Sequence, residues 1–261
     1  MVKSPIAIKK MIFRKVIPGS GSRLTIVDHN ESYGRHILKK AIEGKQIKKC
    51  LDLGCGGGSD LQIVSKLYPD CELLGVDFGK WHEEKLKALN INLLAVDIEK
   101  ETLPFADNSI DLIIANQVFE HTKEIFWINH EIFRCLKVGG YLFFGTPNIL
   151  SFHNRLLMLF GWHPTQFKLT SAHVRPFSKK DVLAFYKNIG QEFCQVEGFW
   201  GSQFYPFPKP IARCLSRLFP NASFSIFFMI KKTSHYKDSF IKWPEFASLE
   251  TNYFVGPDKK D

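Results

Sequence analysis

Between residues 33 and 145, short apolar runs alternate with longer segments in which apolar positions recur every three or four residues. The short runs are typical of strands buried on both faces, and the recurring positions are typical of helices that bury one face. Strands are predicted over residues 50–54, 72–77, 91–96, 110–115 and 141–145. Helices are predicted over residues 33–47, 59–68, 81–89 and 123–136. This alternation predicts an α/β fold with a mainly parallel sheet and helices on both of its faces.

The alternation stops after residue 148. Residues 149–176 hold a short amphipathic helix and a polar loop, and they are predicted to form an insertion after the fifth strand. Ser178, with Asp181 three residues later, predicts the N-terminal cap of a helix over residues 178–189. Two final strands are predicted over residues 193–200 and 224–231, and residues 233–261 are predicted to be a loosely packed tail.

The positive charge of the chain is concentrated at its beginning. The whole chain carries 35 Lys and Arg against 26 Asp and Glu, a net charge of +9. Residues 1–49 hold 12 of the basic and 3 of the acidic residues, which accounts for the +9, and the remainder holds 23 of each. We therefore expect a basic arm over residues 1–30 ahead of a domain over residues 31–232. Such an arm can contact an anionic membrane or a polyanionic substrate, and the alternative is a solvated lead-in.

The composition is that of an ordinary globular protein, with 45% hydrophobic and 23% charged residues. No stretch reaches the roughly 20 apolar residues that span a bilayer, and the first residues lack a signal-peptide core. A cytoplasmic protein, at most peripheral at the membrane, is expected. The six cysteines form no Cys-x-x-Cys pair, which favours buried thiols over a disulfide framework. Of the 24 Phe residues, 18 follow residue 140 and can line an acceptor cavity or fill the core.

A glycine-rich loop follows the first predicted strand and reads Asp52-Leu-Gly-Cys-Gly-Gly-Gly58. Between a strand and a helix, such a loop brings backbone N–H groups and a helix N-terminus close to a ligand. The dinucleotide pattern Gly-x-Gly-x-x-Gly would require glycine at position 59, where this chain has Ser59. The carboxylate of Asp52 suits a ligand with an ammonium or sulfonium centre better than one with a pyrophosphate.

Two further acidic residues end predicted strands. Asp77 ends the second strand, where a carboxylate can accept both hydroxyls of a ribose. Asp97 follows the third strand, where its carboxylate and the backbone amide of Ile98 can hold the edge of an adenine. Each Asp alone would more often be a turn former. Three acids at the carboxyl edge of one sheet, beside a glycine loop, instead predict a ligand that contains adenosine.

Four runs together resemble the motifs of class I S-adenosylmethionine-dependent methyltransferases, in particular the small-molecule branch that occurs with glycan- and quinone-biosynthesis enzymes. They are Cys50-Leu-Asp-Leu-Gly-Cys-Gly-Gly-Gly-Ser59, Leu74-Gly-Val-Asp77, the block over residues 103–121, and Glu131-Ile-Phe-Arg-Cys-Leu-Lys-Val-Gly-Gly-Tyr-Leu142. The resemblance spans roughly residues 48–200. It implies a Rossmann-like, seven-stranded sheet whose last strand is antiparallel, with S-adenosyl-L-methionine as cofactor.

The resemblance also implies where this cofactor binds. The glycine loop would approach its methionine part, with Asp52 near the amino group. Asp77 would take the ribose, and Asp97 would take the adenine. The residues just after the fourth strand would border the sulfonium and the acceptor. The predicted cofactor-binding residues are Asp52, Gly54, Cys55, Gly56, Gly58, Asp77, Phe78, Asp97, Ile98, Asn116 and Gln117.

Transfer of a methyl group to oxygen is helped by a base, because the hydroxyl must lose its proton. His121, after the fourth strand, is the first candidate catalytic residue, and His173 is the second. Arg175 can pair with an anionic group of the acceptor. Alternatively, His121 bonds to the backbone, and His173 and Arg175 pin the insertion in place. No metal site is expected, because the nine histidines lack metal-ligand spacing.

The arm, the insertion and the Phe-rich second half together favour an acceptor with apolar and anionic parts. A lipid-linked glycan methylated on a sugar hydroxyl fits this description, and a quinone precursor methylated on oxygen or carbon is the alternative. Nucleic acid is not expected as a partner, because no separate RNA-binding module is evident. Two other functions stay open. The first is a nucleotide-cofactor oxidoreductase, and Ser59 and Asp97 argue against it. The second is a regulatory protein that binds the cofactor without turnover.

Overall fold

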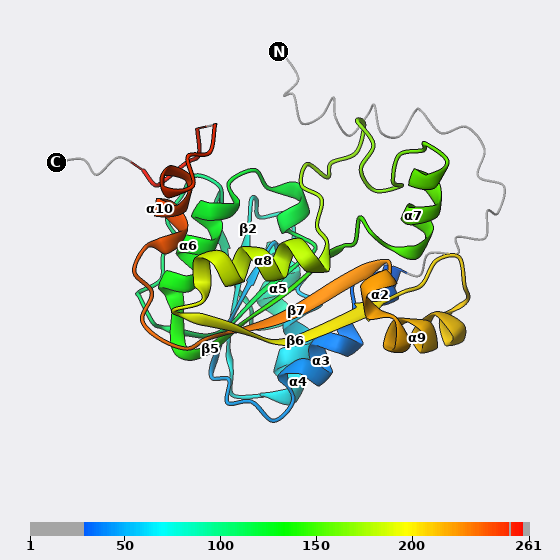
Figure 1. The fold of residues 1–261 in the computed structure, drawn as a ribbon. Coiled ribbons are helices and arrows are strands. Elements are labelled where there is room, and N and C mark those ends of the chain that lie inside the picture. Colours follow the sequence, from blue (N-terminus) through cyan, green and yellow to red (C-terminus); the bar gives the residue numbers. More distant parts are fainter. Residues whose placement is uncertain (1–28, 251, 258–261) are drawn as a thin grey trace, which may run out of the picture.

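The computed structural model of the protein describes residues 29–250 and 252–257. Its strands form one seven-stranded sheet in the order β3-β2-β1-β4-β5-β7-β6 (Figure 1). β7 is antiparallel to both of its neighbours, and the other paired strands are parallel. The strands are β1 (Lys49–Leu53), β2 (Glu72–Asp77), β3 (Asn92–Ala95), β4 (Ile110–Asn116), β5 (Leu136–Pro147), β6 (Cys194–Ser202) and β7 (Ser225–Lys232). The predicted Rossmann-like fold with an antiparallel last strand is confirmed.

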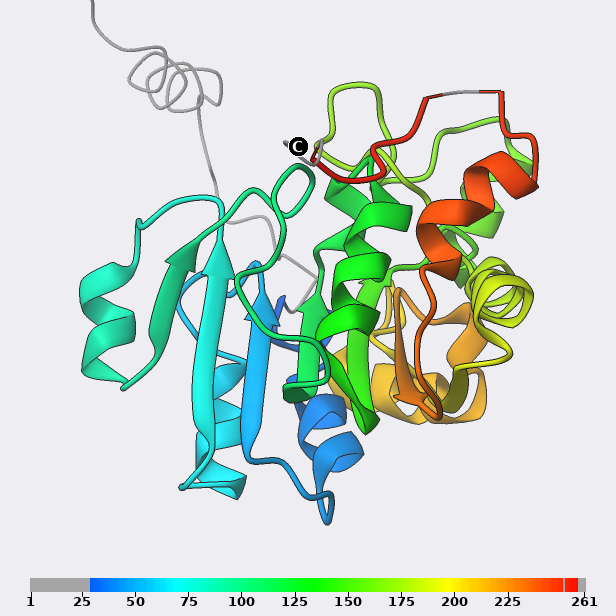
Figure 2. The ribbon, with the colours of Figure 1, turned by 90° about the vertical axis from the view of Figure 1, so that its left-hand side faces the viewer.

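Helices cover both faces of the sheet (Figure 2). Residues of α3, α4 and α5 pack on one face, and residues of α6, α8 and α10 pack on the other. The helices are α2 (His29–Ser32), α3 (Arg35–Ile42), α4 (Leu61–Leu67), α5 (Glu83–Ala88), α6 (Ile125–Cys135), α7 (Phe152–Leu159), α8 (Lys179–Gly190), α9 (Lys209–Leu218) and α10 (Ser239–Phe246), with the 3₁₀ helices η1 (Phe119–His121) and η2 (Pro220–Ala222). None of these helices is long and apolar enough to cross a membrane.

The central strand β1 is buried on both faces. Cys50 packs with the α3 layer, while Leu51 and Leu53 pack with the α6 layer, and all three side chains are fully buried. A strand covered on both sides is apolar along its whole length, which explains the short apolar runs in the sequence. The strand order reverses between β1 and β4, so a crevice is expected at the carboxyl ends of these two strands.

The helix predicted over residues 33–47 is shorter in the structure, because α3 begins after Gly34 and ends at Ile42. α2 ends at Ser32 and α3 begins at Arg35. Gly34 has φ +55°, and a side chain at this position would collide with the ring of Phe227 in β7. The lack of a side chain at Gly34 therefore lets the backbone pass close to Phe227 of β7. The predicted basic arm over residues 1–30 lies outside the described residues except for the beginning of α2.

The prediction of a loosely packed tail over residues 233–261 is wrong for α10. This helix packs against α6 and α8. Its Phe240 is fully buried, with ring centroids 5.3 Å from Phe133 and 5.6 Å from Phe193. The apolar pattern of α10 is short and Pro244 lies inside the helix, so periodicity alone did not reveal it.

The insertion over residues 149–176 leaves and rejoins the fold at one point. Asn148 and Phe177 form an isolated β-bridge that brings the two ends together. α7 occupies the first part of the segment, and the second part returns over η1, where the N–H of Val174 donates to the carbonyl of Glu120 at 2.8 Å. Ser178 caps α8 as predicted, because its Oγ accepts from the N–H of Asp181 at 3.3 Å.

Candidate functional site

The glycine loop after β1 is closely packed on one side and open on the other. Gly54 has φ +66°, and a Cβ atom on it would lie 2.9 Å from a methyl group of Val118. A Cβ atom on Gly58 would lie 2.7 Å from Leu86 and 2.8 Å from Ile91. A Cβ atom on Gly56 would meet nothing within 4 Å. Gly54 and Gly58 are therefore too closely packed to carry a side chain, whereas a Cβ atom on Gly56 would point into open space.

Asp77 joins this loop to the end of β2. Its Oδ2 accepts from the N–H of Gly56 at 2.9 Å, and its Oδ1 accepts from the N–H of Phe78 at 2.8 Å. The exposed ring of Phe78 stacks with that of Trp81 at a centroid distance of 6.5 Å and forms an apolar wall. The carboxylate is thus held in place by backbone donors, as a group that binds ligand hydroxyls requires.

A cavity of about 190 Å³ lies at the carboxyl edge beside this carboxylate. Five of its nine lining residues are among the cofactor-binding residues predicted from the sequence, and Thr122, next to His121, also lines it. The carboxylate of Asp97 accepts from the N–H of Glu99 at 3.1 Å and lies 3.2 Å from Nζ of Lys100. The lining residues are Gly54, Val76, Asp77, Phe78, Val96, Asp97, Ile98, Glu99 and Thr122.

A buried acidic group lies beneath the loop. Burial raises the pKa of Asp52 well above its ordinary value, and the nearby charges of Asp60 and Asp77 raise it further. Asp60 is buried as well, which raises its pKa, and it forms an ion pair with Nε of Arg35 at 2.9 Å. Burial and mutual repulsion disfavour ionisation of both carboxyls, and a bound ammonium or sulfonium centre would favour it again, which fits the expected cofactor.

Asn116 and Gln117 lie at the end of β4, where the sequence placed them, and each makes hydrogen bonds within the protein. Nδ2 of Asn116 donates to Oδ2 of Asp60 at 2.8 Å and to the carbonyl of Tyr33 at 2.9 Å, so this amide ties β4 to the start of the chain. Gln117 has φ +60°, and its N–H donates to the carbonyl of Gly145 at 2.8 Å. Neither side chain lines the 190 Å³ cavity, and Cys55 is buried with the α3 layer. Their roles in cofactor binding stay predictions.

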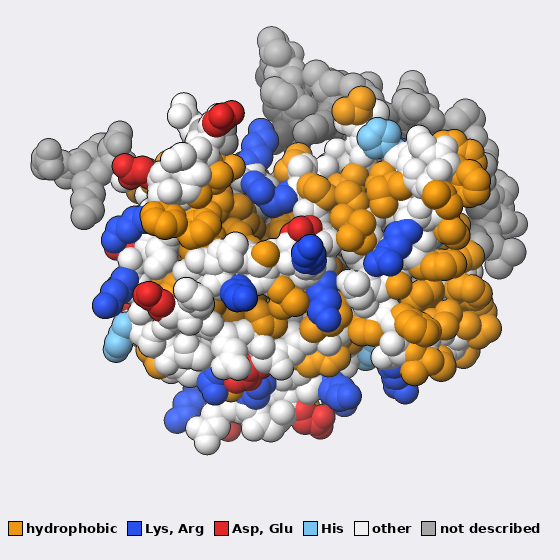
Figure 3. Space-filling model, in the orientation of Figure 1, with side chains coloured by type: hydrophobic (Ala, Val, Ile, Leu, Met, Phe, Trp, Pro, Cys, Tyr) orange, Lys and Arg blue, Asp and Glu red, His pale blue; other side chains and the backbone are white. Residues whose placement is uncertain are grey.

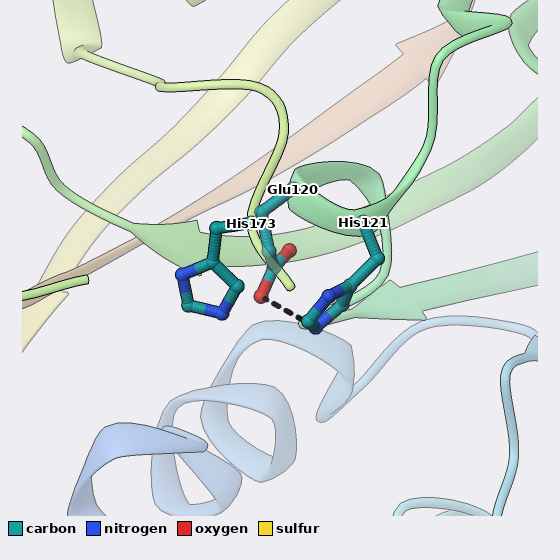
Figure 4. Close-up of side chains that lie close together, drawn as sticks. All are labelled: Glu120, His121 and His173. Atoms are coloured by element: carbon teal, nitrogen blue, oxygen red, sulfur yellow. Dashed lines mark ion pairs between the residues drawn. The ribbon is translucent and has the colours of Figure 1, made fainter. Parts of the chain in front are cut away.

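On the acceptor side, η1 and the returning insertion bring Glu120, His121 and His173 together (Figure 4). The imidazole rings of the two histidines meet edge to face at 4.8 Å. Oε1 of Glu120 lies 3.9 Å from Nε2 of His121. Nδ1 of His121 lies 3.2 Å from the carbonyl oxygen of Ala172. A carbonyl oxygen can only accept, so Nδ1 carries the proton and Nε2 of the neutral ring is left as the base.

Glu120 is the residue that sequence reasoning missed. Its side chain is 1% exposed, and neither carboxyl oxygen has a hydrogen-bond partner. Burial raises its pKa to about 8. Nδ1 of His173 is also buried without a partner, and burial, followed by the charge of His121, lowers the pKa of His173. Buried polar groups without partners are uncommon in folded proteins, and this cluster is therefore a site at which a ligand or a proton is expected.

Arg175 lies next to this cluster rather than in it. Its guanidinium donates to the carbonyl of Lys123 at 2.7 Å, and its Nε is buried without a partner. It also lines an apolar cavity of about 170 Å³ between η1 and α8, together with Phe119, Phe177 and Tyr186. An acceptor with an apolar part beside an anionic part would match this pair of features.

The same cluster could hold a metal ion. The ligand atoms of Glu120, His121 and His173 lie within 4.8 Å of one another, and within residues 29–250 and 252–257 this is the one such group of three. The sequence did not indicate it, because His173 comes from a distant segment. The expectation that the protein has no metal stays a prediction.

Residues 51–144 match the family described as "Methyltransferase domain". The chain is 31% identical over 144 residues to an uncharacterized 37.1 kDa protein in transposon TN4556 of Streptomyces fradiae, covering 52% of this chain and 41% of that protein. It is 32% identical over 104 residues to the malonyl-[acyl-carrier protein] O-methyltransferase of Legionella pneumophila, covering 38% of this chain and 36% of that protein. The chain thus spans less than half the length of these relatives.

Among solved structures, a SAM dependent methyltransferase from Archaeoglobus fulgidus superposes with a TM-score of 0.53 at 16% identity, over 76% of this chain and 94% of that one. This likeness concerns the fold. The glycine loop, the strand-end acids and the match over residues 51–144 concern the cofactor side of that fold. Residues 51–144 thus match a methyltransferase domain, and the chain has the fold of S-adenosylmethionine-dependent methyltransferases.

Proposed function

We propose that this protein transfers a methyl group to a hydroxyl oxygen of a small-molecule or lipid-linked acceptor. The observation that carries the proposal is the buried Glu120 carboxyl beside the rings of His121 and His173, at the acceptor side of the cofactor cavity. When bound, S-adenosylmethionine supplies a methyl group activated by the positive charge on its sulfur. The residues of the chain must then orient the acceptor and take up its proton.

His121 is the residue that takes the proton. Its Nδ1–H is held by the carbonyl of Ala172, so Nε2 faces the cluster as the acceptor of a proton. As the acceptor oxygen takes the methyl group, the methyl–sulfur bond would break to leave a neutral thioether, and the proton of the acceptor hydroxyl would move to Nε2 of His121. The resulting imidazolium lies 3.9 Å from Oε1 of Glu120. Above its pKa of about 8, where Glu120 is ionised before the reaction, its carboxylate would stabilise this positive charge.

The acceptor that fits best has an apolar part and an anionic part. The apolar cavity beside Arg175 can take the first, and the guanidinium can pair with the second. A lipid-linked glycan methylated on a sugar hydroxyl combines these parts. A quinone precursor with a phenolic hydroxyl also combines an apolar and an anionic part. Its methylation needs a weaker base, because a phenol is more acidic than an alcohol.

A carboxylate is the second candidate acceptor. It is suggested by the name of the malonyl-[acyl-carrier protein] O-methyltransferase relative and by the place of Arg175. A carboxylate is already ionised near neutral pH and needs no base. With such an acceptor, loss of His121 would leave the methyl-transfer rate almost unchanged, whereas loss of Arg175 would raise KM.

The test has two stages. Isothermal titration with S-adenosylhomocysteine and, separately, NADH should show binding of the first alone. Methyl transfer is then followed by mass spectrometry with a panel of glycan-lipid, phenolic and carboxylate acceptors, using His121→Asn and His173→Asn. We expect His121→Asn to lower kcat for a hydroxyl acceptor by about 100-fold or more with unchanged cofactor affinity.

The matched control is His163→Asn, an exposed histidine of the same insertion, which should leave kcat unchanged. Equal rates for His121→Asn and the control with a hydroxyl acceptor would rule out the proposed base. Methylation of carboxylates alone would replace the first candidate by the second.

A further inference from the structure

The helix α7 is oriented the opposite way from an ordinary surface helix. Its buried residues are polar, namely His153 and Asn154. Phe152, Leu156 and Leu159 lie on one stripe at the spacing i, i+4 and i+7, and all three are exposed. Phe160, directly after the helix, extends this stripe and is 68% exposed. A helix of a water-soluble domain normally turns such a stripe toward the core.

Hydrogen bonds on the buried side fix this orientation. Nδ2 of Asn154 donates to the side chain of Gln166 at 2.9 Å, and its Oδ1 accepts from the N–H of Thr165 at 3.2 Å. Nε2 of His153 lies 3.0 Å from Oγ1 of Thr165. Burial lowers the pKa of His153 to about 4, so the ring is neutral near pH 7. Rotation of α7 about its axis would break these bonds, so the apolar stripe is held outward.

The exposed stripe continues onto neighbouring elements. Trp162 is 64% exposed, and its ring lies 6.1 Å from that of Phe160. The ring of Phe152 lies 5.7 Å from that of Phe204, in the loop before α9. α9 and the residue after it expose Ile211, Leu218 and Phe219. Figure 3 shows the apolar side chains that gather over α7 and α9 at the right of the view. We call this surface, formed by α7, Trp162 and α9, the α7–α9 face.

The charges around the α7–α9 face are of one sign. Residues 149–180 and residues 198–230 contain no Asp or Glu at all, and both segments contain Lys and Arg. Arg155 and Arg217 are exposed on α7 and α9. Glu31 approaches this side from α2 and pairs with Lys209 and Arg213 of α9. An apolar surface bordered by cations complements an anionic lipid surface, whereas a second copy would bring cations against cations.

We propose that the α7–α9 face docks the protein on an anionic lipid bilayer, with α7 lying in the plane of the interface. Aromatic and aliphatic side chains would enter the boundary between headgroups and acyl chains, and the arginines would contact lipid phosphates. The insertion that carries α7 also carries His173, so docking would hold the cluster of Glu120, His121 and His173 near the membrane surface. This link to a lipid-linked acceptor rests on the proposed function, whereas the docking itself does not.

The test is flotation of the full chain with vesicles of phosphatidylcholine mixed with phosphatidylglycerol, and with vesicles of phosphatidylcholine alone. We expect binding to the anionic vesicles and a loss of about tenfold or more in the double variant L159Q/F160Q. The matched control is F246Q, because Phe246 of α10 is 79% exposed on another part of the molecule and Leu159 is 76% exposed. Unchanged binding of L159Q/F160Q, or an equal loss in F246Q, would overturn the proposal.

Fluorescence gives an independent measurement. Lipids brominated in their acyl chains should quench the emission of Trp162, seen as a difference between the wild type and Trp162→Phe. Absence of this difference contradicts docking through the α7–α9 face, even if the chain binds vesicles by another segment. A wild-type dimer that L159Q/F160Q converts to a monomer would assign the face to self-association and also overturn the proposal.

The experiments distinguish failure of the docking proposal from failure of the proposed function. L159Q/F160Q should bind S-adenosylhomocysteine like the wild type, because the changed residues lie outside the cofactor cavity. If His121→Asn retains full methyl transfer, the proposed function fails while vesicle binding stands. If vesicle binding fails, methyl transfer to a dispersed acceptor still tests the base.

Discussion

The backbone N–H of Gly56 donates to Oδ2 of Asp77 at 2.9 Å, and this hydrogen bond joins the loop after β1 to the end of β2. The carboxylate is therefore both a support for the loop and a side of the cofactor cavity. A backbone donor bound to a charged acceptor is stronger than a neutral hydrogen bond, which suits a loop that must keep a strained shape.

Asp77→Ala should weaken binding of S-adenosylhomocysteine more than Asp77→Asn does. The Asn oxygen can still accept from Gly56, but its amide cannot accept from the N–H of Phe78, and it lacks the charge. We expect about a tenfold loss for Asn and about a hundredfold loss for Ala by titration calorimetry, as loss of one or two charge-assisted hydrogen bonds implies. The exposed Asp70→Asn serves as the control. Equal affinities for Asp77→Ala and the wild type would contradict this role.

Gly54→Ala and Gly44→Ala separate backbone strain from steric collision. Both glycines have positive φ, +66° and +77°, so alanine costs about 1 kcal/mol of strain at either site. Only at Gly54 would the new methyl group meet a neighbour, Val118 at 2.9 Å, whereas Gly44 has nothing within 4 Å. Thermal unfolding should show a larger loss of stability for Gly54→Ala, and cofactor affinity should fall only there. Matching effects of the two variants would show that strain alone governs the loop.

The cofactor side of the fold could be predicted because its signals are local. Asp52, Asp77 and Asp97 lie within two residues of the ends of β1, β2 and β3, and parallel strands bring their carboxyl ends to one edge whatever their distance in sequence. The spacing of the glycines likewise indicated a loop that binds something other than a dinucleotide. What the sequence did not contain is the packing reason for Gly58, which depends on Ile91 from the next unit.

The acceptor side could be predicted only in part, because it is built from distant segments. His121 and His173 were proposed separately, and their contact across 4.8 Å depends on the return of the insertion over η1. Glu120 directly precedes His121 in the sequence, but an isolated glutamate is normally exposed. Its side chain is buried where the insertion returns over η1 and the N–H of Val174 donates to the Glu120 carbonyl, a contact that no periodicity reveals.

Glu120→Gln should change how stability depends on pH. The carboxyl has its ordinary pKa of 4.5 when unfolded and a pKa of about 8 when folded, because it is buried. Below pH 4.5 it is neutral in both states. Between pH 4.5 and about 8 the unfolded chain releases the proton while the folded chain keeps it, so the wild type loses stability as pH rises. The loss is at most about 1.4 kcal/mol per pH unit, and Gln removes it.

Urea unfolding at several pH values across this window measures the difference between the wild type and Glu120→Gln. The variant should gain on the wild type as pH rises toward 8. Glu84→Gln, at an exposed position of α5, should follow the wild type. Parallel stability curves for Glu120→Gln and the wild type would mean that the Glu120 carboxyl is not held neutral by the fold.

Lys232→Met should destabilise the fold without affecting the cofactor. The ammonium is 1% exposed and donates to the carbonyls of Phe133 and Leu136 and to Oδ1 of Asn108, at 2.6, 2.7 and 2.9 Å. Methionine has a similar length but no donor, so two buried carbonyls at the end of α6 lose their partner, at a cost of roughly 2–4 kcal/mol. Urea unfolding should show this loss, whereas Lys231→Met, at the adjacent and more exposed position, should have little effect. If both variants unfold at the same urea concentration, the Lys232 ammonium does not hold the end of α6.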